Sequence, residues 1–333
     1  MHLTVKRRLH ALVTTALGAA VLGACNLPPG MTPAPGGSGS GAAPAPAAVA
    51  PAPTLGGCPV FPANNPWNTK VNTLAVRPDS ARLIANISSP GKTKLHPDFG
   101  GGGAYGIPFL VVPATQPKVP INFTAYGDES DPGPYPIPAT APVEGGNASN
   151  GDRHVLVLQQ GTCHLYELGR AFWATNHWNA DVGVNWNLSS NALRPAGWTS
   201  ADAAGLPILP GLVRYSEVAA GHIDHAVRFT VPRSQMGYIF PATHYASSST
   251  NAALPPMGLR LRLKASFSLA GFHGESLVIL QALKTYGMIV ADNGSSWYIS
   301  GAVDTRWNDD DLDQLKTVPG TAFEAVNTGV IHH

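Results

Sequence analysis

The stretch LRLRLKASFSL, residues 259–269, alternates apolar and polar side chains along its whole length. Successive side chains of a β-strand point to opposite faces, so the leucines, Ala265 and Phe267 share one face. Arg260, Arg262, Lys264 and two serines share the other. The pattern predicts a half-buried antiparallel strand with a basic outer face.

Two further segments show strand patterns. HVLVLQQGTCHLYEL, residues 154–168, is typical of a β-hairpin that turns near Gln160–Thr162. Both faces of its first arm are apolar, which indicates a central strand buried on both sides. YGIPFLVVP (105–113) and VPINFTAYG (119–127) form another candidate pair around the linking residues 114–118. Prolines at both ends of several runs favour short strands that stop at sheet edges.

Helical patterns are few. Residues 274–287, GESLVILQALKTYG, place apolar side chains at helical spacing and end at Gly287, and WNDDDLDQLK (307–316) predicts a short helix opening on acidic residues. SADAAG (200–205) predicts one more turn. The fold class expected is mainly β: an antiparallel β-sandwich or jelly-roll-like barrel with a few short peripheral helices. No second linker appears, so residues 58–333 are expected to form a single β-rich extracytoplasmic domain.

The N-terminal segment has the pattern of a bacterial lipoprotein. Residues 1–24 combine the basic residues 6–8 with an apolar run that is too short to span a bilayer. The run ends in LGAC, which resembles a lipobox and implies lipidation of Cys25, although ordinary secretion with a free Cys25 is the alternative. Residues 25–57 are rich in Pro, Ala, Gly and Ser and carry no charge, which indicates an extended tether. We therefore expect an exported protein, lipid-anchored at the extracytoplasmic face of the membrane or the cell surface.

Cysteine count and composition narrow the class further. If Cys25 is lipidated, Cys58 and Cys163 remain as a disulfide pair. Only 12% of residues are charged, 36 are Gly and 31 are Pro, which indicates a chain rich in turns and loops. The formal net charge is +1 and no basic stripe appears, so nucleic acid is not expected as a partner. The oligomeric state is left open.

Several long strings resemble one uncharacterised family of secreted bacterial proteins. They are FPANNPWNTKV (61–71), HPDFG (96–100), DESDPGPYPIP (128–138), GDRHVLVL (151–158), NALRPAGWTSADAAGLPILPGLVRY (191–215), HYASSST (244–250) and LKTYGMIVADNGSSWYISG (283–301). The resemblance spans nearly all of residues 58–328. It implies no activity and no catalytic residue, because none is established for that family.

The densest carboxylate group lies in YGDESDPGPYPIP, residues 126–138. Asp128, Glu129 and Asp131 fall within four residues and precede a stiff proline-rich stretch that contains Tyr135. Neighbouring carboxylates repel each other, so one can stay protonated as a general acid while another stays ionised. Such a pair cleaves glycosidic bonds. A calcium site built from the same oxygens, or simple turn chemistry, are the alternatives.

Histidines near strand entries supply further catalytic candidates. In GHIDHAVRFTV (221–231), His222 and His225 point to opposite strand faces, which argues against a shared metal ion and leaves Asp224 and His225 as cleft candidates. Asp152 and His154 lie at the mouth of the strand 154–158, in a stretch that also contains Glu144. His244 precedes a serine run without the pattern of a nucleophile elbow. Each also has a purely structural interpretation as a hydrogen-bonded strand end.

The segment ADNGSSWYISG, residues 291–301, suits carbohydrate recognition. Trp297 and Tyr298 can stack on sugar rings, and Asp292 and Asn293 can bind hydroxyl groups. Arg228 and Tyr135 complete the expected substrate-binding set. The alternative is a hairpin turn at Asn293–Gly294 followed by a buried strand. GGGGAYG (100–106) is rich in glycine but lacks the Lys-Ser/Thr ending of a phosphate loop.

The sequence therefore favours a surface-tethered enzyme that cleaves a polysaccharide by carboxylate acid/base chemistry. Two alternatives remain: a non-catalytic carbohydrate-binding or adhesion module, and a structural envelope lipoprotein. Membrane contact through the lipid anchor and an extracellular glycan are the partners expected. No cofactor and no metal site is predicted, with calcium at residues 126–138 as the exception to test.

Overall fold

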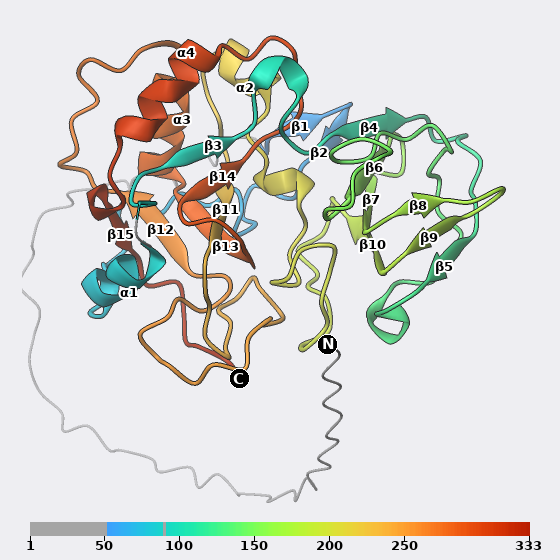
Figure 1. Cartoon of the computed structure of the whole chain (residues 1–333), viewed down its shortest axis with the longest axis horizontal. Helices are drawn as coiled ribbons and strands as arrows, with labels where there is room; N and C mark the ends of the chain where they lie inside the picture. The colour runs from blue at the N-terminus through green and yellow to red at the C-terminus, as the bar shows by residue number, and fades with distance from the viewer. Residues whose placement is uncertain (1–51, 89–90) are drawn as a thin grey trace, which may run out of the picture. The chain divides into compact units, whose positions relative to one another are not determined.

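The computed structural model describes residues 52–88 and 91–333 (Figure 1). Strands dominate these residues and the helices are few and short, so the expectation of a mainly β fold is confirmed. The described helices are α1 Ser80–Ile87, α2 Tyr215–Ala220, α3 Gly274–Thr285 and α4 Asp309–Leu312, with 3₁₀ turns η1 Gly101–Gly103, η2 Gly127–Glu129, η3 Leu209–Gly211, η4 Asp313–Thr317 and η5 Gly320–Ala322. None of the helices in these ranges is long and apolar enough to cross a membrane.

The larger sheet has six strands in the order β15-β12-β13-β11-β14-β3. Antiparallel pairs predominate, but β11 pairs with β13, and β14 with β3, in parallel. Helix α3 packs on this sheet, and the apolar side chains of both elements belong to the main hydrophobic core. The strands are β3 His96–Asp98, β11 Val227–Val231, β12 Arg260–Leu263, β13 Met288–Asn293, β14 Tyr298–Ser300 and β15 Phe323–Ala325.

A four-stranded sheet, β10-β7-β6-β4, lies between two cores. Leu156 and Leu158 of β6 enter the main core, whereas Val155 and Val157 enter a smaller core with Trp178. A three-stranded sheet, β5-β9-β8, contributes to that smaller core (Figure 1). The strands are β4 Phe109–Val112, β5 Ile121–Phe123, β6 Val155–Gln159, β7 His164–Gly169, β8 Phe172–Trp173, β9 Trp178–Ala180 and β10 Val182–Asn187.

Patterns set by neighbouring residues are confirmed. Strands β6 and β7 form the expected antiparallel hairpin, and every residue of β6 is buried. Helix α3 begins at Gly274 as expected, and Gly287 takes a left-handed φ of 68° just beyond its end. Residues 307–316 hold α4, whose first turn is capped by the side chain of Asn308.

Three expectations that depend on distant partners are wrong. Strands β4 and β5 do not pair with each other, since β4 joins β6 and β5 joins β9. The alternating stretch 259–269 is a strand only over Arg260–Leu263. Its basic face is covered rather than exposed, because Arg260 and Arg262 are buried and donate to backbone carbonyls of residues 66–74.

The first residues of the described chain are tied to the fold. Strands β1 Thr54–Leu55 and β2 Cys58–Pro59 form a small hairpin around Gly56 and Gly57, so the last residues of the expected 25–57 linker are paired. Cys58 and Cys163 form the expected disulfide, with a sequence separation of 105. A cross-link over such a span removes roughly 4 kcal/mol of chain entropy from the unfolded state. Residues 1–24, the lipidation candidate Cys25 and linker residues 26–51 lie outside the described residues.

Candidate functional site

Polar side chains from four adjacent strands share one face of the six-stranded sheet. On β11, Val227, Phe229 and Val231 are in the core, while Arg228 and Thr230 point to the opposite face. Thr230 is in register with Asp292 of β13 and Tyr298 of β14. On the same face, His96 and Asp98 of β3 are in register with Tyr298 and Ser300. This polar face carries the candidate site.

A buried ion pair lies at the centre of the polar face. Asp202 is fully buried and receives two hydrogen bonds of 2.7 Å from the Arg228 guanidinium. Arg228 also donates to Ser300 Oγ at 2.6 Å and lies 3.6 Å from the carboxylate of Asp292. Bidentate pairing of this kind fixes both the position and the orientation of the arginine.

A second charged pair comes from the segment that leads into β6 of the four-stranded sheet. His154, just before β6, places Nδ1 2.5 Å from Glu144 Oε2 and Nε2 3.0 Å from the carbonyl of Ala201. Burial alone would lower the pKa of His154, but the hydrogen bond and charge of Glu144 raise it to about 9. At neutral pH the ring is therefore a buried cation that donates from both nitrogens.

Asp292 is an acidic group of this network that reaches solvent. Its side chain is 25% exposed, and Oδ1 accepts a 2.6 Å hydrogen bond from the backbone N–H of Asn293. Burial and the charge of Asp202 raise the pKa of Asp292 to about 7, against the lowering effects of Arg228 and His154. Near neutral pH this carboxyl group is thus partly protonated and able to give up a proton.

Asp292 opens into a pocket of about 310 Å³ that we call the Asp292 pocket. It brings together four predicted catalytic or binding residues that are far apart in the sequence: Asp152, His154, His244 and Asp292. His244 Nδ1 lies at a hydrogen-bond distance of 2.7 Å from the carbonyl oxygen of Ala203. The remaining lining comes from Tyr126, Gly169, Arg170, Asp181, Val182, Thr199, Ser200, Ala201, Ala203 and Ala246.

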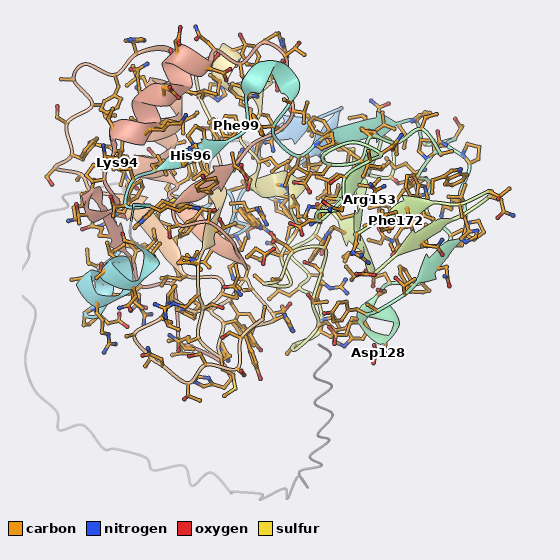
Figure 2. All side chains as sticks on the ribbon, in the orientation of Figure 1. Lys94, His96, Phe99, Asp128, Arg153 and Phe172 are labelled. Atoms are coloured by element: carbon orange, nitrogen blue, oxygen red, sulfur yellow. A yellow bond between two sulfur atoms is a disulfide. The ribbon has the colours of Figure 1, made fainter. Side chains whose placement is uncertain are left out.

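The carboxylates of the 126–138 loop lie beside this pocket and do not line it. Glu129 accepts the backbone N–H of Thr199 at 2.8 Å. Asp131 accepts from Arg194 and from the backbone of Asn185, both at 2.9 Å. Asp128 is exposed and lies well away from His96 (Figure 2). Glu129 and Asp131 thus hold the loops that border the pocket, and only Tyr126 of this segment reaches its lining.

Residues 222–225, which lead into β11, do not line the Asp292 pocket. His225 is fully buried, with Nδ1 2.7 Å from the carbonyl of Ala226 and Nε2 3.2 Å from Glu217. Asp224 is exposed to solvent beside His222 and receives a long 3.4 Å hydrogen bond from Tyr286. The structural interpretation of this strand entry, with His225 as a satisfied core histidine, fits these contacts.

The predicted substrate-binding residues divide into buried and exposed ones. Trp297 and Tyr135 are core residues with no ring face free for a sugar: Trp297 packs between Phe229 and Phe323, and Tyr135 donates to the carbonyl of Asp131. Arg228 is buried behind Asp292. Asn293 is exposed next to Asp292, and Tyr298 lines a second pocket described below.

Three residues of the charged network were not predicted as site residues: Glu144, Asp202 and Asp98. Burial raises the pKa of Asp98, the charge of Arg228 lowers it, and the charge of Glu144 raises it. The Asp98 carboxyl is therefore coupled electrostatically to one member of each charged pair. Glu144 lies ten positions before His154, and its spacing alone gives no sign of their contact. Asp98 lies in the HPDFG string, the one sequence signal that draws attention to it.

The described ranges, 52–88 and 91–333, contain no group of three or more His, Cys, Asp or Glu side chains placed to hold a metal ion. Asp128, Glu129 and Asp131 lie within these ranges, and their side chains do not come together in such a group.

Comparisons of this chain with protein-family models, with curated proteins and with solved structures find no match.

Proposed function

We propose that the protein is an exported, surface-tethered enzyme that cleaves a glycosidic bond in a polysaccharide. The observation that supports this most directly is the carboxyl group of Asp292, with a pKa of about 7, in an open pocket shared with Asp152. Glycosidic cleavage needs one carboxyl group that is protonated at working pH and a second carboxylate to act as base or nucleophile.

In this proposal Asp292 is the general acid that protonates the leaving oxygen. Asp152, exposed at the mouth of the strand β6 and within the same pocket, is the second carboxylate. Arg228 and His154 are positioning residues: they hold positive charge behind Asp292, which stabilises its carboxylate once the proton has been transferred. Glu144 and Asp202 keep those two cations in place.

Release of reducing ends tests this function. The purified full chain is incubated with a panel of bacterial, fungal and plant polysaccharides, and new reducing ends are measured over time. Release from one substrate supports the enzyme, whereas glycan binding without product supports the carbohydrate-binding module. The absence of both product and binding across the whole panel supports the structural envelope lipoprotein.

The tether and the lipid anchor belong to the same proposal. Lipidation at Cys25 followed by the uncharged, proline-rich linker holds the domain outside the cytoplasm, near an extracellular glycan. We expect Cys25→Ser to move the protein from the membrane fraction to the soluble fraction of its host. A variant that stays membrane-bound contradicts the anchor.

A further inference from the structure

The glycine-rich loop 100–106 has no part in the Asp292 pocket, yet it shapes a second one. Gly100, Gly101, Gly102 and Gly103 all take positive φ, between 61° and 113°, a region that side chains disfavour. A Cβ on Gly101 would lie 2.6 Å from the ring of Tyr105. The glycines therefore let the loop fold back under Tyr105, whose side chain remains 65% exposed.

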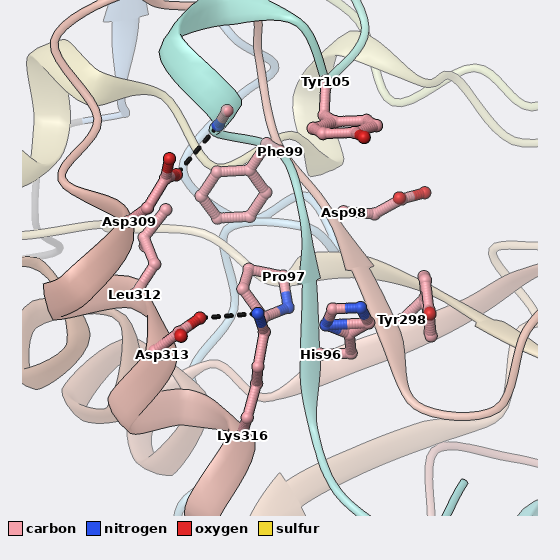
Figure 3. A pocket seen from close by; sticks show the side chains of 11 residues that line it. His96, Pro97, Asp98, Phe99, Tyr105, Tyr298, Asp309, Leu312, Asp313 and Lys316 are labelled. Atoms are coloured by element: carbon pink, nitrogen blue, oxygen red, sulfur yellow. Dashed lines mark hydrogen bonds and ion pairs between the residues drawn. The ribbon is translucent and has the colours of Figure 1, made fainter.

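Tyr105 borders a pocket of about 510 Å³, the Tyr105 pocket. Figure 3 shows Tyr105, Asp98 and Tyr298 on one side of this pocket and the side chains of α4 and η4 on the other. The rings of Tyr298 and His96 meet edge to face at 4.1 Å between centroids. Two tyrosines, one fixed by a glycine loop and one by a strand, thus present aromatic surface to the same hollow.

The charges of the Tyr105 pocket disfavour an anionic ligand. Lys316 is paired with Asp313 at 2.5 Å, and Asp309 accepts the backbone N–H of Gly101 at 2.8 Å (Figure 3). Burial and the nearby charge of Lys316 lower the pKa of His96, so its ring is neutral at pH 7. Lys92 Nζ lies 5.6 Å from the centre of the Tyr298 ring and offsets one negative charge, but Asp98 and Asp309 still leave a net negative charge, which repels uronates and sulfated sugars.

The Tyr105 pocket and the Asp292 pocket are neighbours on the polar face. Asp98, in the lining of the first, is in register with Ser300. Ser300 accepts from Arg228, which lies 3.6 Å from Asp292 in the second pocket. These contacts place the two pockets near each other on the polar face, with the buried side chains of Ser300 and Arg228 between them.

We propose that the Tyr105 pocket is a sugar-binding subsite for an uncharged glycan chain whose cleaved bond lies at Asp292. The inference rests on the proposed function and adds the charge class of the substrate and the place where a distant sugar unit binds. An exposed aromatic ring favours the apolar face of an uncharged sugar, because contact removes apolar surface of both from water.

Binding and kinetics of Tyr105 variants test the subsite. Calorimetry with neutral hexasaccharides of glucose, xylose, mannose and N-acetylglucosamine, and with hexagalacturonate, gives affinity without requiring turnover. We expect one neutral hexasaccharide to bind, the uronate not to bind, and Tyr105→Ala to weaken binding about tenfold. Tyr105→Phe retains the ring and should bind like wild type. Phe240→Ala removes an aromatic side chain that is 43% exposed and lines neither pocket, so it is the matched control.

The outcomes separate this subsite from the enzyme. If a polysaccharide is cleaved and Tyr105→Ala raises KM for the hexasaccharide but not for a disaccharide, the subsite is supported. If cleavage occurs and the Tyr105→Ala variant binds and cleaves the hexasaccharide like wild type, sugar binding at the Tyr105 pocket is wrong and the proposed cleavage is supported. If hexasaccharide binding depends on Tyr105 and no polysaccharide is cleaved, the proposed cleavage at Asp292 is wrong and sugar binding at the Tyr105 pocket is supported. Tight binding of the uronate overturns the assigned charge class.

Discussion

Replacing Asp292 by asparagine is expected to lower kcat about a thousandfold on the polysaccharide that the wild-type protein cleaves. Asparagine keeps the shape of the side chain and can still accept the backbone N–H of Asn293, but it has no proton to give to a leaving oxygen. The loss is expected mainly in kcat, because the proton is transferred in the transition state. Reducing-end release at saturating substrate measures it.

Glu129→Gln is the control for this variant. Glu129 uses its carboxylate to accept the backbone N–H of Thr199, a bond that a glutamine oxygen can also accept, and it does not line the Asp292 pocket. We expect activity within about twofold of wild type. Equal, large losses in both variants would show that proton donation does not belong to Asp292 alone.

The second large effect concerns the buried pair behind the site. Arg228→Met leaves Asp202 fully buried without its cation, so we expect the free energy of unfolding to fall by about 3–5 kcal/mol. The double variant Arg228→Met with Asp202→Leu removes both charges and should recover much of that stability. Equilibrium unfolding in urea measures all three proteins.

An exposed ion pair gives the matched comparison. Arg306 and Asp304 pair on the surface, with 60% of the arginine side chain exposed, so Arg306→Met should change the free energy of unfolding far less than Arg228→Met does. If Arg228→Met and Arg306→Met have similar costs, or if the double variant is no more stable than Arg228→Met, the central role of the buried pair is wrong.

Local patterns in the sequence predict the secondary structure well. The β6–β7 hairpin and helix α3 follow from side chains within a dozen residues of each other, and both form as expected. The stretch 259–269 shows where such reasoning ends. Its alternation is local, but the cover over Arg260 and Arg262 comes from residues 66–74, nearly two hundred positions away.

Sequence chemistry points to some residues that line the Asp292 pocket, but it does not point to Glu144, Asp202 or Asp98, and it does not show which residues meet in space. Asp152, His154, His244 and Asp292 each have acid, base or hydrogen-bonding chemistry, and the fold brings them into one pocket. The 126–138 loop has the denser carboxylates, yet its side chains bind loops beside the pocket. The pKa of Asp292 is set by its burial and by the charges of Asp202 and Arg228. Neither the burial nor these two charges can be recognised from the residues next to Asp292 in the sequence.

The pH dependence of kcat/KM tests the central assignment most directly, because it reports the proton that Asp292 has to give. An acid with a raised pKa of about 7 is active while protonated, so kcat/KM should fall as the pH rises above about 7. The profile is measured from pH 5 to 8.5 on the cleaved polysaccharide, with tryptophan fluorescence showing that the protein stays folded. A decline centred near pH 7 is the result we predict. A rate that stays constant or rises up to pH 8.5 would contradict Asp292 as the general acid.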